Sequence, residues 1–319
     1  MIDAASLRSN DLSVQQLRSF CAVFEQGSYS AAAKQQFLAT ATVWEQVRGV
    51  ERCYETTLFT RHGRNIRPND EAQMLYDALR PVLTGLDSSF EVLDERRSPS
   101  QLRLVTGMRM LLEELGDHFR SFLESHPGVS LQLLHGDNVT AEELIAADEA
   151  DLGLTLAPPP QTDQTGFVYE KAYSVEFLAL APPDHPLAGR ARLRLNDLIK
   201  YPLIVGHHGT NSRRVLEEAL HREELLEKAQ IAVETDNSAF TAACVRAGLG
   251  VGIVAGRGGG PITKDLVGLS LRNQLGNARI VFIWKAGRIL SQGVLDLIED
   301  IKRSGAERSE KKGKSKSKG

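Results

Sequence analysis

Three arginines near residue 63 form a set of side chains with an evident chemical use. Arg61, Arg64 and Arg67 lie around Gly63, in a stretch that we expect to form two short extended arms. Guanidinium groups are planar and donate several hydrogen bonds, which suits the oxygens of a phosphate group. The stretch from Thr60 to Arg67 is therefore predicted to be a wing whose charges are available to the phosphates of a nucleic acid.

Two polar turns that contain glycine suggest a second kind of chemistry. One turn, 106–109, follows a predicted strand, and the other, 206–212, precedes a predicted helix. Backbone amides at helix N-termini bind anions, so both turns are candidates for holding a small anionic molecule. Thr155, at the end of another strand, is a third candidate. The candidate residues are Thr106, Gly107, Met108, Arg109, Thr155, His207, His208, Thr210, Asn211 and Ser212.

Other interpretations of these turns stay open. The 206–212 turn could serve only to cap its helix, and Arg109 could pair with Glu113, four residues along the same helix. The segment 236–238 could form a polar rim or a helix cap at Asn237 or Ser238. The two adjacent histidines have no visible third ligand, so we predict neither a metal site nor a cofactor.

The sequence contains none of the common catalytic motifs. There is no Gly-x-Ser-x-Gly elbow, no phosphate-binding Gly-x-x-x-x-Gly-Lys-Ser/Thr loop, no His-Glu-x-x-His, and no Gly-x-Gly-x-x-Gly after a strand. The glycine run 256–261 follows a strand, but Pro261 favours a loop, and we interpret the run as a mobile turn. We predict that the protein is not an enzyme; an α/β enzyme with an unrecognised site is the alternative.

Three short helices must position the wing. Ser13 and Gln16 have the capping-box spacing, and the helix that they open should stop near Gly27. A second helix is expected from Ser28 or Ser30 to about Phe37, and a third over roughly 40–51. Three short helices with tight turns are typical of a helix-turn-helix unit. The apolar stripes that support this prediction are Leu17, Phe20, Cys21 and Phe24 in the first helix and Val43, Val47 and Val50 in the third.

A longer helix is predicted over 70–93. Its apolar residues recur every three or four positions, as in a seam that packs against another helix, and Pro81 should bend it. Such a seam needs a partner, either a second chain or another part of this one. The seam consists of Leu75, Leu79, Val82, Leu86, Phe90 and Leu93.

Strands and helices alternate after a hinge at 96–100. This rhythm favours a mostly parallel sheet that is covered on both faces and divided into two α/β halves. The predicted strands are 102–106, 129–134, 151–156, 175–181, 202–205, 231–233 and 251–254, and the predicted helices lie within 111–119, 141–147, 212–220 and 239–247.

Composition limits the class of protein. The 319 residues suffice for two ordinary domains or three small ones. Because 25% of the residues are charged and no apolar run approaches the ~20 residues that cross a bilayer, we expect a soluble protein without a membrane partner. The N-terminus lacks the pattern of a signal peptide, and three scattered cysteines indicate a reducing cytoplasm.

The C-terminal end is basic although the chain as a whole carries a net charge of -3. Residues 302–319 contain eight Lys or Arg and two Asp or Glu, which is +6 and leaves -9 for the rest. Residues 310–319 have nothing apolar to bury, so we expect a disordered basic tail from 305 to 319. It could keep the protein soluble or attract nucleic acid transiently.

The sequence resembles the LysR-type transcriptional regulators from Leu12 to about Ile301. The head carries the resemblance through Gly27-Ser28-Tyr29-Ser30, Gln46-Val47 and Leu58-Phe59, and the second half carries it through His126-Pro127-Gly128 and 247–252. The resemblance implies an all-α winged helix-turn-helix head at 1–68, a linker and dimerisation helix at 69–97, and at 98–304 a two-lobed α/β effector domain similar to periplasmic solute-binding proteins of type 2. The two polar turns then belong to opposite lobes, and the chain is expected to cross between lobes near 172–175 and 268–272.

The same resemblance implies where DNA is contacted. The third helix enters the major groove of double-stranded DNA, and the wing and flanking residues hold phosphates. The family usually has Ser-Gln-Pro-Ala at the start of this helix, whereas here Ala39-Thr40-Ala41-Thr42 and then Trp44-Glu45 occur, so base readout must differ. The implied contact residues are Ser30, Thr40, Ala41, Thr42, Trp44, Glu45, Arg48, Arg61, Arg64 and Arg67.

These observations predict a cytoplasmic transcription regulator that forms a dimer or tetramer and senses a small, anionic metabolite. Residues 11–68 contain seven Lys or Arg and five Asp or Glu, a difference of only +2, which is little for a DNA-binding surface. A ligand-binding or protein-interaction module whose head has lost DNA readout is therefore the alternative.

Overall fold

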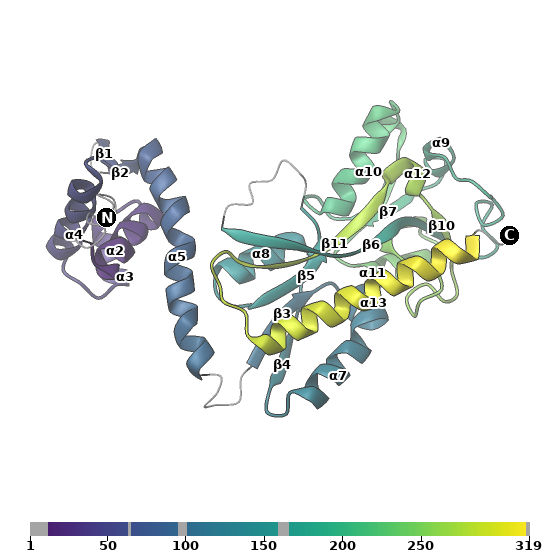
Figure 1. Cartoon of the computed structure of the whole chain (residues 1–319). Coiled ribbons are helices and arrows are strands. Elements are labelled where there is room, and N and C mark those ends of the chain that lie inside the picture. Colours follow the sequence, from purple (N-terminus) through teal and green to yellow (C-terminus); the bar gives the residue numbers. More distant parts are fainter. Residues whose placement is uncertain (1–11, 63–64, 95–100, 159–165, 317–319) are drawn as a thin grey trace. The chain divides into compact units, whose positions relative to one another are not determined.

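The structure is a computed structural model, and it describes residues 12–62, 65–94, 101–158 and 166–316. The chain divides into two units, one of residues 1–96 with 285–289 and one of 97–284 with 290–319. The two units are described separately (Figure 1).

The first unit begins with three helices, α2 (Val14–Gln26), α3 (Tyr29–Gln35) and α4 (Thr40–Tyr54). The predicted capping box is confirmed, because the Ser13 side chain accepts from the Gln16 amide and the Gln16 side chain accepts from the Ser13 amide. Gly27 ends α2 in the left-handed conformation that glycine adopts without strain. The start and the end of α2 therefore have local causes in the sequence.

One apolar core holds the three helices together. Val43, Val47 and Val50 of α4 are fully buried and pack with residues such as Phe20 and Ala32. The two strands of the wing, β1 (Phe59–His62) and β2 (Asn65–Pro68), pair antiparallel, with Thr60 opposite Arg67. The wing is anchored to α4 through Glu51, which is 7% exposed and accepts from the Leu58 amide at 2.8 Å.

Helix α5 (Asp70–Asp94) confirms the predicted long helix, with Pro81 inside it. The apolar seam has two parts with different surroundings. Leu75 and Leu79 pack against the core of the head, so these residues are covered by their own chain. Val82 and Phe90 are 63% and 64% exposed, respectively. The side chain of Leu93 lies outside the described residues.

The second unit is an α/β structure built on one mixed sheet in the order β4-β3-β5-β11-β6-β9-β7-β8, with β10 paired to β6. The first lobe contains the parallel strands β3 (Gln101–Thr106), β4 (Ser130–His135) and β5 (Leu152–Leu156). The second lobe contains the parallel strands β7 (Leu203–Gly206), β8 (Ile231–Thr235) and β9 (Val251–Gly256). The expected division into two α/β halves is confirmed.

Two antiparallel strands connect the lobes. Strand β6 (Phe167–Ala181) pairs with β9 and with β10 (Val267–Ser270), and β11 (Asn277–Lys285) pairs with β5. The sheet is therefore less parallel than the sequence led us to expect. The second crossing also lies later than 268–272, because β10 still pairs with β6 in the second lobe and the chain reaches β5 only at Ile280–Ile283.

Helices cover the sheet, and several of them begin just after a strand ends. The first lobe carries α6 (Met108–Met110), a π-helical turn (Leu111–Leu115), α7 (Gly116–Ser125) and α8 (Asn138–Ala146). The second lobe carries α9 (Leu195–Leu198), α10 (Asn211–Arg222), a 3-10 turn (Leu226–Lys228), α11 (Ser238–Arg246) and α12 (Arg272–Leu275). Four of these helices, α6, α8, α10 and α11, begin directly after strands, which places their N-termini at one edge of the sheet.

The C-terminal helix α13 (Gln292–Lys316) packs against α7 and β6 (Figure 1). The structure therefore differs from the expected disordered tail, because its backbone is helical as far as Lys316. A physical reason is that seven of the twelve residues from 305 to 316 are Lys, Arg or Glu, which are good helix formers, and no proline interrupts them. Within the described residues, no helix is both long enough and apolar enough to cross a membrane.

Candidate DNA interface and effector cavity

Helix α4 presents one face to the core and the opposite face to solvent. While Val43, Val47 and Val50 are buried, the residues on the other side are exposed. The helix N-cap, Ala39, makes no side-chain hydrogen bond to the first turn, so Thr40 is the first helical residue and does not cap α4. The exposed positions are Thr40, Ala41, Thr42, Trp44, Glu45 and Arg48, which are all among the residues expected to contact DNA.

Arg48 is not a free cation on this face. Its Nη1 donates to Glu51 Oε2 at 3.0 Å, and its guanidinium carbon lies 5.3 Å from the centre of the Trp44 ring. The same carboxylate anchors the wing at Leu58. The position of Arg48 is thus set from two sides, by the ring of Trp44 and by Glu51.

The remaining candidate residues of the head lie around α4. Ser30 is exposed in α3, and its hydroxyl lies 3.0 Å from that of Ser28, which caps α3. Arg67 is exposed in β2. The side chain of Arg61 and the whole of Arg64 lie outside the described residues.

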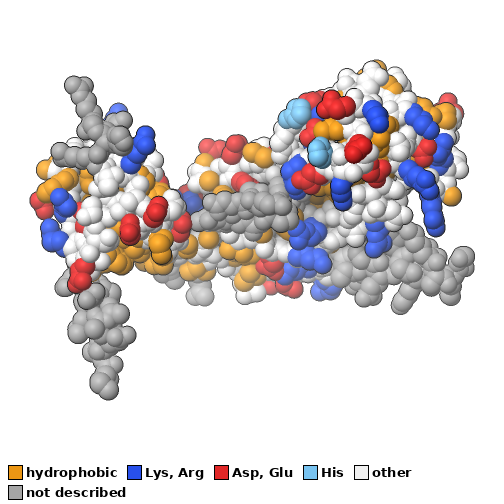
Figure 2. Space-filling model, turned by 90° about the horizontal axis from the view of Figure 1, so that it is seen from above, with side chains coloured by type: hydrophobic (Ala, Val, Ile, Leu, Met, Phe, Trp, Pro, Cys, Tyr) orange, Lys and Arg blue, Asp and Glu red, His pale blue; other side chains and the backbone are white. Residues whose placement is uncertain are grey.

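The charges of the head are mixed. Figure 2 shows basic and acidic side chains side by side on the visible face of this unit, together with exposed hydrophobic ones. This agrees with the small charge difference of the sequence over 11–68. The head therefore offers little net positive charge for nonspecific attraction to phosphates.

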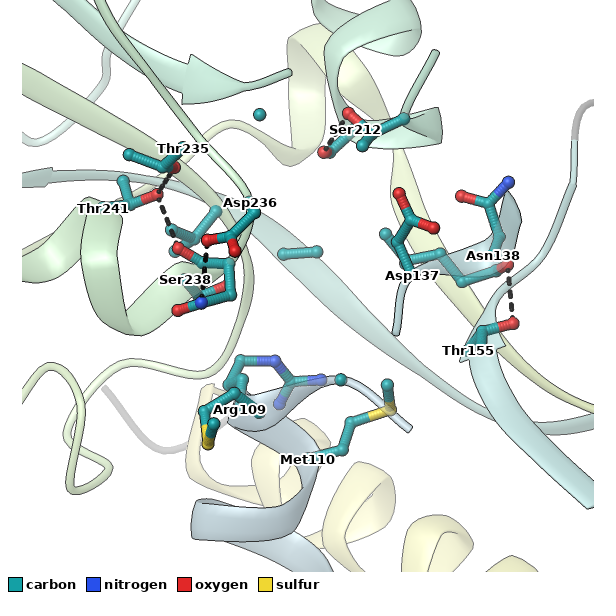
Figure 3. Close-up of a pocket in the computed structure, with 18 of the residues that line it drawn as sticks. Arg109, Met110, Asp137, Asn138, Thr155, Ser212, Thr235, Asp236, Ser238 and Thr241 are labelled. Carbon is teal, nitrogen blue, oxygen red and sulfur yellow. Dashed lines mark hydrogen bonds between the residues drawn. The ribbon is translucent and has the colours of Figure 1, made fainter. Parts of the chain in front are cut away.

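A cavity of about 120 Å³ lies between the two lobes (Figure 3). Arg109 and Met110 of the first lobe line one side, Asp137, Asn138 and Thr155 a second, and Ser212 a third. The turn between β8 and α11 forms the fourth wall of the cavity. Strands β9 and β11 form an apolar fifth wall. The residues of these last two walls are Thr235, Asp236, Asn237, Ser238, Thr241, Ile253, Val254, Ala255 and Ile280.

Six of the ten residues expected to hold an effector line this cavity, namely Gly107, Met108, Arg109, Thr155, Thr210 and Ser212. Thr106 does not, because its hydroxyl is buried and donates to Leu154 O at 2.9 Å across the sheet. His207, His208 and Asn211 also lie outside the lining and make other contacts. Asn237 caps α11, as one interpretation of the sequence had it, by accepting from the Ala239 and Phe240 amides at 3.0 Å.

Sequence reasoning missed the turn between β4 and α8, which contributes His135, Gly136, Asp137 and Asn138. Asp236 was considered only as part of a possible polar rim at 236–238, which does line the cavity, and Thr241 was not considered. A signal was present, since both turns follow a strand of a parallel set and ligands bind at the carboxyl ends of such strands. Asp137 further marks a helix start, because its Oδ1 accepts from the Thr140 amide at 2.9 Å.

Arg109 belongs to a buried ionic network at the edge of the cavity. Its Nη1 donates to Glu114 Oε1 at 2.6 Å and lies 3.5 Å from Glu113 Oε2. The pair of Arg109 with Glu113 that the sequence suggested is therefore present. The shorter contact, however, is to Glu114, five residues after Arg109. A π-helical turn brings residues five apart into line, and Leu111–Leu115 is such a turn. Tyr173 of β6 donates to the other oxygen of Glu114.

Burial and charge act in opposite directions on this network. Burial is the largest single effect and lowers the pKa of Arg109, but Glu114, Tyr173 and Glu113 together raise it by more, so the net pKa is raised and the guanidinium stays charged. Burial raises the pKa of Glu113, and the charge of Arg109 offsets only part of that effect. Burial, followed by the charge of Glu114, also raises the pKa of Tyr173, which keeps its hydroxyl a donor.

The two ends of the glycine run after β9 pack closely against this network. A Cβ at Gly256 would lie 3.0 Å from Arg109 Cδ, and a Cβ at Gly260 would lie 2.5 Å from Glu113 Oε1. The amide of Ile262 donates to Glu113 Oε1 at 3.3 Å. Gly258 and Gly259, between these two positions, are exposed, and a Cβ there would meet nothing within 4 Å. The interpretation of the run as a mobile turn stays a prediction, with its two ends held against the network.

Two polar contacts join the lobes beside the cavity. Asn211 Nδ2 of the second lobe donates to Ala157 O of the first at 2.5 Å. His207 Nε2 lies 3.2 Å from Asp137 Oδ2, and His207 Nδ1 lies 2.8 Å from His208 O. His207 and Asn211 therefore link the lobes instead of lining the cavity.

No cluster of metal-binding side chains occurs in the part of the chain that the structure describes. His208 is largely exposed, and its Nε2 lies 3.6 Å from Glu234. The adjacent histidines thus face different carboxylates.

A winged helix-turn-helix head and a two-lobed unit with a cavity of ligand size define a ligand-binding, DNA-binding class of protein, and comparisons with known proteins agree. Residues 14–73 match the bacterial regulatory helix-turn-helix protein model of the lysR family, and residues 96–306 match the LysR substrate binding domain. The chain belongs to the LysR family and is a LysR-type transcriptional regulator with DNA-binding and effector-binding domains.

Individual relatives are similar over most of their length. The chain is 25% identical to the HTH-type transcriptional activator CmpR of Synechocystis over 246 residues, which cover 76% of this chain and 78% of that protein. It is 27% identical to the transcriptional activator protein LysR of Escherichia coli over 247 residues, covering 76% and 77%. The fold is similar to that of full-length BenM, with a TM-score of 0.54, 18% identity and coverage of 93% and 98%.

Proposed function

We propose that α4 reads DNA bases through the exposed residues Thr40, Ala41, Trp44 and Glu45, and that the wing holds phosphates. The observation that carries this proposal is the division of α4, whose three valines are buried while the opposite face is open to solvent. Glu45 can accept from cytosine N4, and Trp44 can pack on a thymine methyl group. Arg48, held against Trp44, supports the ring instead of reaching a distant phosphate.

A gel-shift titration on the DNA that flanks the protein's own gene tests this proposal. Two salt concentrations separate specific from nonspecific binding, because each phosphate contact adds to the dependence of affinity on salt. We expect a shifted complex on this DNA and at least about a hundredfold weaker binding to unrelated DNA of equal length. Equal binding to both, or none, would rule out sequence-specific regulation.

We further propose that the cavity between the lobes holds the effector. A cavity of about 150 Å³ can hold a benzene-sized molecule, so a volume of about 120 Å³ indicates a small metabolite. The N-terminus of α10 supports an anionic group, because its N-cap Thr210 makes no side-chain hydrogen bond to the first turn. Asp137 and Asp236 lie on other walls and disfavour a second anionic group there.

Effector binding is proposed to act on a subunit assembly. Val82 and Phe90 of α5 leave an apolar stripe exposed, and pairing of two α5 helices would cover it. Closure of the cavity would then shift the population of head arrangements on a dyad-symmetric site. The proposed role is regulation without catalysis, and the proposed location is the cytoplasm, where chromosomal DNA is accessible.

Mass spectrometry of small molecules that co-purify with the chain would identify the ligand.

A second candidate function rests on the charges of the head. Glu45 lies on the exposed face of α4, and Arg48 is paired with Glu51, so little positive charge is free there. A head of this kind could bind a protein instead of DNA. Replacing Glu45 with Arg should change DNA affinity and base preference if DNA is the partner, and leave both unchanged if a protein is.

A further inference from the structure

Phe37, in the turn between α3 and α4, combines two unfavourable features. Its side chain is 95% exposed, and its backbone has φ +56°, in the left-handed region. The turn has the hydrogen bonds of a Schellman motif, from the Phe37 amide to Lys34 O at 3.3 Å and from the Leu38 amide to Ala33 O at 2.9 Å. Glycine usually occupies the left-handed position of this motif, since a Cβ there strains the backbone.

Within the described residues, the exposed ring of Phe37 gains no packing that could offset this strain. The ring is not packed in the core of the head, whose members include the neighbouring Leu38. An aromatic ring in water gains no hydrophobic stabilisation. A residue held in an unfavourable backbone region without structural gain points to a role in function.

The position of Phe37 indicates which partner covers it. It precedes Thr40, the first residue of α4, by three residues, and Thr40, Ala41 and Trp44 are exposed at the same end of that helix. The first turn of α4 has no side-chain cap, so its amides are also open to an anionic partner. A duplex approached by this end of α4 would meet the ring of Phe37.

We propose that Phe37 is a DNA-contacting residue that packs its ring on apolar atoms of the duplex beside the end of α4. These atoms are either a deoxyribose ring or a thymine methyl group, which present the same chemistry to an aromatic ring. The inference rests on the proposed DNA-binding function and extends it to a residue outside the recognition helix.

Phe37→Gly and Phe37→Asn test the proposal, because both residues tolerate the left-handed conformation. We expect neither variant to melt below the wild type, and both to bind the specific site about tenfold more weakly, as the loss of one buried ring contact predicts. Glu55→Gly is the matched control, since Glu55 has φ +54° at the other end of α4. This control should bind DNA no more weakly than the wild type.

The outcomes separate this proposal from the broader one. Wild-type protein that binds no specific DNA would overturn both. If the wild type binds its site and both Phe37 variants bind it equally well, only the role of Phe37 is overturned. If these variants also lose activation in purified transcription while their DNA affinity is unchanged, Phe37 contacts a protein instead of DNA. Weaker binding on every sequence assigns the sugar contact, and weaker binding only where one thymine is present assigns the methyl contact.

Discussion

Replacing Arg109 with methionine is expected to destabilise the effector unit strongly. The side chains of Arg109, Glu113 and Glu114 are 7%, 6% and 7% exposed, and the guanidinium is the cation that both carboxylates approach. Removing one partner of a buried ion pair costs about 3–5 kcal/mol, because the other charge remains without compensation. The free energy of unfolding should fall by that amount, and the melting temperature by roughly 6–20 °C for a unit of this size.

Urea unfolding followed by tryptophan fluorescence measures this loss. The chain has two tryptophans, Trp44 in the head and Trp284 in the effector unit, so a Trp44→Phe background leaves a single reporter on β11. The double variant Arg109→Met with Glu114→Gln should recover part of the stability, since glutamine still accepts from Tyr173. A loss below about 1 kcal/mol, or no recovery in the double variant, would refute the structural role of Arg109 and favour a direct role in ligand binding.

Three further outcomes follow from the same structure. The raised pKa of Glu113 means that, above pH 4.5, the folded wild type binds more protons than the unfolded chain, so its stability falls as the pH rises. Glu113→Gln should flatten this pH dependence. Urea midpoints measured from pH 4 to 7 check this. Asp137→Asn keeps the cap of α8 but removes the carboxylate that His207 contacts. Hydrogen exchange in the 207–212 turn should then become up to about fivefold faster. Unchanged exchange would show that this contact between the lobes does not stabilise the turn. Val82→Glu with Phe90→Glu should shift sedimentation toward monomer, and an unaltered oligomer would exclude pairing through this stripe.

Local patterns in the sequence were sufficient to predict the head. Ser13 with Gln16, and the valine stripe of α4, act through residues three or four apart, and the structure has both as predicted. Gly27 likewise ends its helix through its own backbone freedom. The fold of the head could therefore be argued before any long-range contact was known.

The cavity was predicted only in part because distant segments meet there. Arg109 pairs with Glu114 through a π-helical turn, and no helical periodicity of the sequence indicates such a turn. Asp137 and Asp236 belong to different lobes and line the same cavity, although they are nearly a hundred residues apart in the chain. Motif spacing in the sequence therefore could not show that they share a site. Strand β11 was missed although its apolar run at 280–283 is the usual pattern of a buried strand.

Selection of bound sequences from a random DNA pool tests the central claim most directly, with wild-type protein compared with Glu45→Ala and Trp44→Ala. If the exposed face of α4 reads bases, the wild type enriches a dyad-symmetric site, and each variant loses preference at its own position in both half-sites, at about 1–3 kcal/mol per contact. Enrichment of the same site by all three proteins, or of no site by the wild type, would contradict the account.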